Sequence, residues 1–234
     1  MRIKSYIKRI LTSPKRTFSK QTVLRKISET AQSNNEVVNI YRKDPDNVGD
    51  YYCAPRFYFK KLSTPPLDIF DYKSPQKEIT DNWIKTISES KLIIGGGGFL
   101  NRGSFEKQMK LFEYLNEKNK KTVLWGIGHN SKNKKDFRKI SSYNIDTRSF
   151  GLVGIRDYDI AHTEWVPCVS CLHSVFDNTY IPTQEIGVVF HKKTLNNRNI
   201  TSKFKDFPTT SNTTNLEKLV RFIGSSETII TDSY

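Results

Sequence analysis

The sequence of 234 residues predicts an α/β protein with a parallel sheet and helices on both of its faces. Two observations lead to this fold class. Short apolar runs typical of strands recur along the chain, and stretches with the apolar spacing of helices separate them. A third observation concerns ligands, because each predicted strand runs into glycines or polar side chains, as at a binding edge of such a sheet.

The predicted strands are short and rich in β-branched residues. The first covers residues 37–41, directly after a polar stretch. The later ones are expected at 92–94, 122–125, 152–155, 186–190 and 228–230. Because helical patterns separate them, the crossover connections favour parallel pairing.

The predicted helices each carry one apolar face. They cover residues 79–87, 105–115 and 216–223. Thr214 and Glu217 have the spacing of a capping box before the last of them. Residues 194–215, rich in Asn and Thr, are expected to form a loop.

Charge is concentrated at the start of the chain. The formal net charge is +14, and residues 1–27 hold nine basic and no acidic residues. Apolar residues at helical spacing within residues 3–11 predict a basic amphipathic helix, ended by Pro14. This helix could pack on its own domain or lie on an anionic membrane surface. Nucleic-acid binding is disfavoured, because the segment holds no recognised binding motif.

Several protein classes are excluded by composition. Aromatic residues make up 12% of the chain, too many for a disordered protein. We find no apolar run long enough for a membrane span and no apolar stretch after the first residues that would indicate a secretory signal. A cytoplasmic protein with reduced thiols is therefore expected. Cys168 and Cys171 are expected to be buried beside Trp165, and with Cys53 they do not form a four-ligand zinc pattern, so no metal is predicted.

Six strand ends carry the residues from which a site could be built. Ligands of open parallel sheets bind outside the carboxyl ends of the strands, where glycines let backbone N–H groups approach an anion. Arg156 follows a strand directly and could grip a carboxylate or phosphate with two hydrogen bonds. The alternative for Arg156 is an ion pair with Asp157, and the alternative for Asn47, Asp50 and Asp232 is helix capping. His129 and His191 could act as acid or base, or be structural.

Five pieces in a fixed order resemble the polysaccharide pyruvyltransferase family. They are Asn47-Val48-Gly49-Asp50, Ile93-Ile94 with Gly95–Gly98, Trp125-Gly126-Ile127-Gly128, Gly154-Ile155-Arg156-Asp157 and Ile229-Ile230-Thr231-Asp232. The resemblance runs from about residue 36 to the end. Ser233 differs from the Arg that many members carry after this Asp, and the expected His and Gly would follow residue 234.

The resemblance implies a GT-B-like fold, in which two Rossmann-like domains face each other across a cleft. We expect a basic helical segment at 1–35, a first Rossmann-like domain at 36–180 and the start of a second, incomplete one at 181–234. A chain that stops before the His-Gly pair would be a C-terminally truncated member.

The resemblance also implies a reaction. Members transfer pyruvate from phosphoenolpyruvate to sugar hydroxyls, forming a ketal in capsule, exopolysaccharide or cell-wall glycans. No cofactor beyond this donor is expected, the acceptor would be a glycan or lipid-linked sugar, and residues 1–27 could touch the inner membrane face. The residues assigned to catalysis are His129, His191 and Arg156, and those assigned to substrate binding are Asn47, Gly49, Asp50, Gly96, Gly97, Gly98, Gly128, Asp157 and Asp232.

Two alternatives stay open. A GT-B glycosyltransferase would place the diphosphate of a nucleotide sugar at the same strand ends. A non-catalytic relative would bind a ligand there without turning it over.

Overall fold

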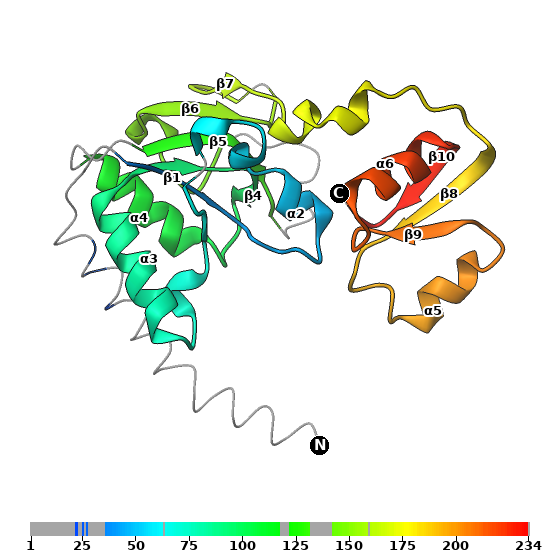
Figure 1. The fold of residues 1–234 in the computed structure, drawn as a ribbon, viewed down its shortest axis with the longest axis horizontal. Helices are drawn as coiled ribbons and strands as arrows, with labels where there is room; N and C mark the ends of the chain where they lie inside the picture. The colour runs from blue at the N-terminus through cyan, green and yellow to red at the C-terminus, as the bar shows by residue number, and fades with distance from the viewer. Residues whose placement is uncertain are drawn as a thin grey trace, which may run out of the picture.

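The fold is that of a computed structural model, which describes residues 22, 25, 27, 36–62, 64–117, 122–131, 142–158 and 160–233. Its described part contains two parallel sheets (Figure 1). We call the sheet in the order β2-β1-β3-β5-β6-β7 the large sheet, and the one in the order β10-β8-β9 the small sheet. The predicted α/β class with a parallel sheet is confirmed.

The large sheet is formed by the first part of the chain. Its strands are β1 (Val37–Tyr41), β2 (Leu67–Asp68), β3 (Lys91–Ile94), β5 (Thr122–His129), β6 (Leu152–Ile155) and β7 (Glu164–Trp165), while β4 (Gly97–Leu100) pairs with β5 beyond the end of β3. The strands predicted at 37–41 and 152–155 are confirmed. A strand that the sequence did not predict, β4, begins at Gly97 within the glycine run, and β5 runs four residues further than predicted, to His129.

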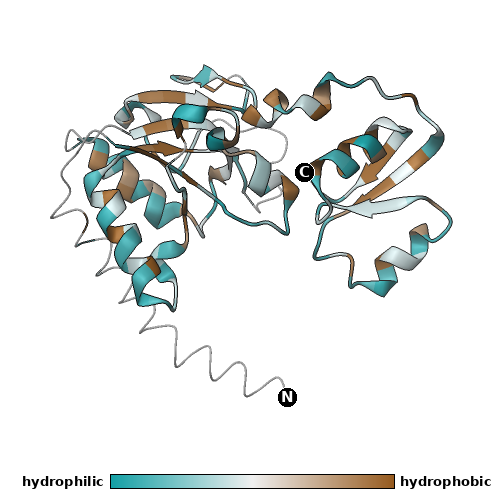
Figure 2. Cartoon of the chain, in the orientation of Figure 1, coloured by the Kyte–Doolittle hydropathy of each residue, from teal (hydrophilic) through white to brown (hydrophobic). Residues whose placement is uncertain are grey.

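Two helices, α3 (Lys77–Glu89) and α4 (Glu106–Glu117), bury their apolar faces against this sheet. The short helix α2 (Val48–Tyr52) follows β1. Trp83 and Ile87 from α3, and Met109 and Phe112 from α4, are fully buried in one core with the strand residues. Figure 2 shows the apolar strands of the large sheet beside helices whose remaining residues are polar. Burial of these aromatic and aliphatic groups, at about 1.5–3 kcal/mol each, supplies most of the driving force for folding.

The small sheet contains β8 (Gln184–Phe190), β9 (Thr209–Ser211) and β10 (Ser226–Thr231) with α5 (Arg198–Thr201) and α6 (Leu216–Gly224). The prediction of a loop at residues 194–215 is wrong in part, because this segment contains α5 and β9. The N-cap of α6 is Asn215, whose Oδ1 accepts from the N–H of Lys218 at 2.8 Å, and Thr214 is not the cap. Asparagine suits this position because its short side chain reaches the unpaired first-turn N–H groups.

A second, smaller apolar cluster joins the two sheets. Val48 of α2 and Leu216 of α6 are buried together with Val175. Figure 1 shows α2 beside α6 at this joint, on the side of the large sheet that faces the small one.

Little of the basic N-terminal segment is described. Residues 22, 25 and 27 are helical, and Ile27 is fully buried in the core of the large sheet. The amphipathic helix predicted at 3–11 lies outside the described residues. None of the helices in the described ranges combines the length and the apolar character needed to span a bilayer.

Candidate functional site

The glycine run after β3 serves close packing within the chain. A Cβ at Gly95 would lie 1.9 Å from the carbonyl oxygen of Trp125, and one at Gly96 would lie 2.2 Å from that of Cys53. Gly96 also donates its N–H to the Cys53 oxygen at 3.1 Å. A Cβ at Gly98 would meet the Asn130 side chain at 2.6 Å. The absence of side chains here lets β3 and β4 lie directly against α2 and β5.

Gly97 differs from its neighbours, because it faces candidate site residues. Its φ of +99° suits glycine, and a Cβ there would lie 3.4 Å from the Cys53 Sγ and 3.8 Å from the Asp50 Oδ1. The run therefore places backbone beside Asp50 at the carboxyl end of the large sheet.

Arg156 lies across Gly128 on the neighbouring strand. A Cβ at Gly128 would meet the Arg156 Nε at 2.6 Å and its Cγ at 2.7 Å. Because Gly128 has no side chain, the arginine side chain can occupy the space beside it. The ion pair with Asp157 considered from the sequence is absent, and within the described ranges no carboxylate pairs with Arg156. Arg156 is half-buried, so its guanidinium is positioned at a strand end with donors left for a ligand.

Asp157 acts as an anchor between strands. Its Oδ2 accepts from the backbone N–H of His129 and from the Tyr143 hydroxyl, both at 2.7 Å. Burial, and then this hydrogen bond, raises the pKa of Tyr143, so the phenol stays protonated and donates. The Asp157 carboxylate therefore positions the end of β5 and the Tyr143 side chain, and it does not pair with Arg156.

His129 is the last residue of β5. Its Nδ1 lies 3.3 Å from the Asn101 Nδ2, and its Nε2 lies 3.4 Å from the N–H of Ser131. The backbone of Asn101 is itself fixed by a reciprocal pair with Asn144. The ring is thus oriented at the same strand-end edge as Arg156.

Asn47 and Asp50 contact each other at the start of α2. The Asn47 Nδ2 donates to the Asp50 Oδ2 at 2.9 Å, and Asn47, although at the N-cap position, makes no capping bond. Burial, with the nearby Asp44 carboxylate, raises the pKa of Asp50, while Arg42, Lys192 and Arg156 oppose the rise. Gly49 is exposed on the same turn. Asp50 therefore shares its electrostatic environment with Arg156.

The ends of the small sheet are organised around Asp232. Its Oδ1 accepts from the His191 N–H at 2.7 Å, and its Oδ2 accepts from the Thr194 hydroxyl. The His191 Nδ1 accepts from the N–H of Lys193 at 3.1 Å, which leaves Nε2 to carry the proton of the neutral ring. Asp232 thus holds the turn that presents His191 after β8.

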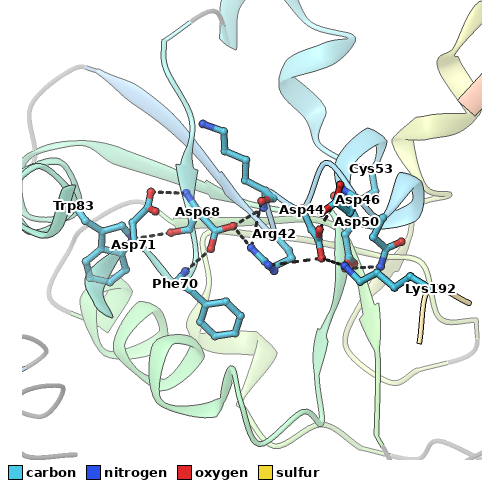
Figure 3. Close-up of polar contacts among 12 residues, drawn as sticks. Arg42, Asp44, Asp46, Asp50, Cys53, Asp68, Phe70, Asp71, Trp83 and Lys192 are labelled. Carbon is cyan, nitrogen blue, oxygen red and sulfur yellow. Dashed lines mark hydrogen bonds and ion pairs between the residues drawn. The ribbon is translucent and has the colours of Figure 1, made fainter. Parts of the chain in front are cut away.

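Lys192 connects the two sheets. Its Nζ lies 2.5 Å from the Asp44 Oδ2. The same oxygen lies 3.6 Å from the Arg42 Nη2, and the Arg42 Nη1 in turn pairs with Asp68 (Figure 3). Burial acts to raise the pKa of Asp44, but the Lys192 and Arg42 cations outweigh it and lower that pKa. The sequence analysis assigned no role to Lys192, although its position directly after His191 was an available signal.

Asn212 is the second connector, and sequence reasoning missed it. Its Oδ1 accepts from the Lys192 N–H at 2.8 Å, its Nδ2 donates to the Asn47 Oδ1 at 3.2 Å, and its carbonyl accepts from the Val48 N–H at 3.0 Å. Asn212 is 3% exposed. It places the start of α2, with Asn47 and Asp50, against the end of β8.

The cysteines differ from the sequence expectation. Cys53 is buried, and burial raises the pKa of its thiol, but Cys171 and Trp165 are exposed, so the expectation that Cys168 and Cys171 pack in an apolar core beside Trp165 is wrong. In the part of the chain that the structure describes, no three His, Cys, Asp or Glu side chains gather in a way that could hold a metal ion.

The strand ends thus bring together two groups of predicted site residues. One group lies at the carboxyl-end edge of the large sheet and contains Gly96, Gly97, Gly98, Gly128, His129, Arg156, Asp157 and, on α2, Asp50. The other follows strands of the small sheet and contains His191 and Asp232. Asn47, at the start of α2, accepts a hydrogen bond from Asn212, which follows β9. Comparisons with curated proteins and with solved structures gave no match.

A comparison with models of protein families matched most of the chain. The model of the family described as Polysaccharide pyruvyl transferase matches residues 29–234, which covers both sheets and every candidate residue above. Such a match implies a transferase with a pyruvate donor and a polysaccharide acceptor. The chain therefore belongs to the polysaccharide pyruvyl transferase family.

Proposed function

We propose that this protein transfers pyruvate from phosphoenolpyruvate to two hydroxyls of a sugar, in the synthesis of a capsule, exopolysaccharide or cell-wall glycan. The observation that carries the proposal is Arg156, a half-buried guanidinium laid across Gly128 at the end of β6 without a carboxylate partner among the described residues. The donor carries a phosphate and a carboxylate, and a planar guanidinium binds either with two parallel hydrogen bonds.

The reaction needs one proton added to the methylene carbon of phosphoenolpyruvate and protons removed from the attacking sugar hydroxyls. A proton is added to the methylene carbon of phosphoenolpyruvate, and the neighbouring carbon becomes an oxocarbenium-like centre that the first sugar hydroxyl attacks. The bond from that carbon to the phosphate oxygen breaks, and the second hydroxyl closes the ring. The two hydroxyls lose two protons, of which the new methyl group keeps one and the released phosphate carries the other.

His129 and His191 are the groups we assign to these proton transfers, because imidazole donates and accepts protons near neutral pH. His129 lies at the end of β5, on the strand next to that of Arg156. His191 follows β8 of the small sheet, and its turn is held by Asp232. Asn47 and Asp50 would bind acceptor hydroxyls, while Gly97 would offer its backbone to the ligand.

The two sheets would act as two Rossmann-like units of a GT-B-like arrangement, covering residues 36–180 and 181–234. The Lys192–Asp44 ion pair and the Asn212 contacts support this, because they join residues that follow β8 to residues that follow β1. The carboxyl ends of the two sheets then meet, and ligands of parallel sheets bind at such ends. A place at the cytoplasmic face of the inner membrane would suit the nine basic residues within 1–27.

Thermal unfolding with phosphoenolpyruvate tests this proposal. A ligand that binds the native state at about 100 times its Kd adds roughly 2.7 kcal/mol of stability, which raises the midpoint. We expect phosphoenolpyruvate to raise it, Arg156→Ala to abolish the rise, and Arg221→Ala to retain it, because Arg221 is exposed on α6. A rise with nucleotide sugars alone would instead assign glycosyl transfer, and equal loss in both variants would indicate non-specific attraction to a basic protein.

A further inference from the structure

An open pocket of about 340 Å³ lies between the ends of β1 and β2. Arg42 and Lys43 follow β1, and Phe70, Asp71 and Lys73 follow β2. Because both strands are parallel members of the large sheet, the pocket opens at the same edge as Arg156. None of its residues was assigned a role in the proposed reaction.

Asp68 gives the pocket a rigid wall. Its Oδ2 accepts from the Arg42 Nη1 at 2.5 Å and from the Lys43 N–H at 2.6 Å, and its Oδ1 accepts from the Phe70 N–H at 2.7 Å (Figure 3). Asp68 is 6% exposed. Its charge is therefore matched by Arg42, and the backbone on both sides of the pocket is fixed before any ligand arrives.

Cations gather around one aromatic ring in this pocket. The Lys73 Nζ lies 3.5 Å from the centroid of the Phe70 ring, and the Arg42 Cζ lies 5.4 Å from it. Phe70 is itself stacked on Phe105, with ring centroids 5.0 Å apart. The ring holds the two cations at the pocket by its negative face, and it adds an apolar surface between them.

The remaining charges favour an anion that also carries hydroxyls. The side chain of Lys43 is exposed and forms no ion pair with the described residues. Asp71 uses its Oδ2 to accept from the Asp68 N–H at 3.0 Å, while within the described ranges its Oδ1 accepts no hydrogen bond. Two lysines beside a carboxylate oxygen and an aromatic surface match the parts of a phosphorylated sugar.

We propose that this pocket binds a sugar phosphate, with Lys43 and Lys73 on the phosphate, Asp71 on a sugar hydroxyl and the Phe70 ring along the apolar edge of the sugar. Binding here does not depend on the proposed reaction. Its assignment to the acceptor site does rest on the proposed function. With neighbouring strands about 4.8 Å apart, the ends of β1 and β2 lie roughly 15–20 Å from the end of β6. The pocket would then hold the phosphate-bearing end of an extended acceptor whose distant sugar reacts beside Arg156.

Isothermal titration with glucose 1-phosphate tests the proposal, with glucose and inorganic phosphate as comparison ligands. We expect glucose 1-phosphate to bind more tightly than either. The variant Lys43→Gln with Lys73→Gln should weaken it about tenfold or more, because two charged contacts are lost. The matched control is Lys77→Gln with Lys85→Gln, which removes the same charge from exposed positions on α3. Asp71→Asn should weaken glucose 1-phosphate and leave inorganic phosphate unchanged.

Several outcomes would overturn the proposal. Equal weakening in the pocket and control variants would mean non-specific charge, and inorganic phosphate binding as tightly as glucose 1-phosphate would mean a simple anion site. Binding to phosphatidylglycerol vesicles that depends on Lys43 and Lys73, without binding of glucose 1-phosphate, would assign the pocket to a membrane surface. Loss of glucose 1-phosphate in Arg156→Ala would place the ligand at the donor site.

The two proposals fail separately. If the phosphoenolpyruvate shift is absent but glucose 1-phosphate binding follows the pocket variants, the proposed reaction fails and the pocket stands. If the shift depends on Arg156 and glucose 1-phosphate does not bind, the pocket proposal fails alone.

Discussion

The ammonium of Lys192 lies 2.5 Å from the carboxylate of Asp44, although 148 positions separate the two residues in the sequence. Lys192 follows a strand of the small sheet, and Asp44 follows a strand of the large one. Their side chains are 29% and 14% exposed, so water screens the pair only in part. The pair, together with Asn212, fixes how the ends of the two sheets face each other.

Breaking this pair should loosen the joint between the sheets. We expect Lys192→Gln and Asp44→Asn each to lower the free energy of unfolding by about 1 kcal/mol, as for a partly exposed, hydrogen-bonded charge pair. The double variant should lose less than the sum, with a coupling of about 0.5–1 kcal/mol. Urea unfolding of the native protein, the two single variants and the double variant measures this coupling. Additive losses would show that the two side chains do not interact.

The same pair gives a pH dependence with a defined sign. The pKa of Asp44 is lowered in the folded protein, so its stabilisation is complete above the ordinary Asp pKa of about 3.9 and is lost as the pH falls through the lower folded value. The difference in stability between the native sequence and Asp44→Asn should therefore be constant from pH 7 to about pH 5 and shrink below about pH 4. A difference that grows in acid would contradict this sign.

Substitution of Gly96 should be far more costly than substitution of a glycine in open space. In Gly96→Ala the new Cβ would lie 2.2 Å from the backbone oxygen of Cys53, which cannot move without shifting α2. We expect a loss of about 3 kcal/mol or more, since overpacked cores respond by backbone displacement. In Gly103→Ala no atom lies within 4 Å, and the change should stay within about 0.5 kcal/mol. Equal urea midpoints for the two variants would refute the contact.

The sequence predicted most of the large sheet, because its strands are apolar runs with helical patterns between them. The missed strands have physical reasons. β2 and β7 are two residues long, β4 begins in a glycine run, and β9 lies in a polar stretch where only pairing with β8 indicates a strand. Periodicity cannot identify a strand that short or that polar.

The candidate site was predictable only where it follows a strand. Arg156 and His129 were proposed in this way, because the end of a parallel strand is a binding position. The role of Asp157 depends on Tyr143, which approaches from a separate segment, and Asn212 lies 165 positions from Asn47. Such contacts arise from tertiary packing and leave no local pattern. The assigned roles in catalysis and binding stay predictions.

Asp50→Asn should separate stability from activity. Burial beside Asp44 raises the pKa of Asp50, so the charged form is less favourable in the folded than in the unfolded protein. Removing the charge should raise the free energy of unfolding at pH 7, and this gain should disappear at a pH where the native carboxyl is protonated in both states. Pyruvate transfer should fall if Asp50 binds the acceptor. Denaturation at pH 7 and pH 3 measures the first effect, and a loss of stability at pH 7 would contradict it.

Gly128→Ala tests whether the position of Arg156 matters, without touching the guanidinium itself. The new Cβ would meet the Arg156 side chain at 2.6 Å from Nε and 2.7 Å from Cγ, so the arginine must leave its place across the strand. Side chains adjust more easily than backbone, and we expect a loss of only about 1 kcal/mol in unfolding free energy. Phosphoenolpyruvate affinity should fall about tenfold or more, because a displaced guanidinium cannot keep two aligned hydrogen bonds.

The comparison that decides is between Gly128→Ala, Arg156→Ala and Gly103→Ala, each titrated with phosphoenolpyruvate in the folded state. Gly103→Ala should bind like the native protein, because nothing lies within 4 Å of that glycine's missing side chain. If Gly128→Ala also binds like the native protein while Arg156→Ala does not, the guanidinium binds the donor from another position. Donor binding would then depend on the charge of Arg156 and not on the space beside Gly128. Gly128 would in that case serve only close packing, like Gly95, Gly96 and Gly98.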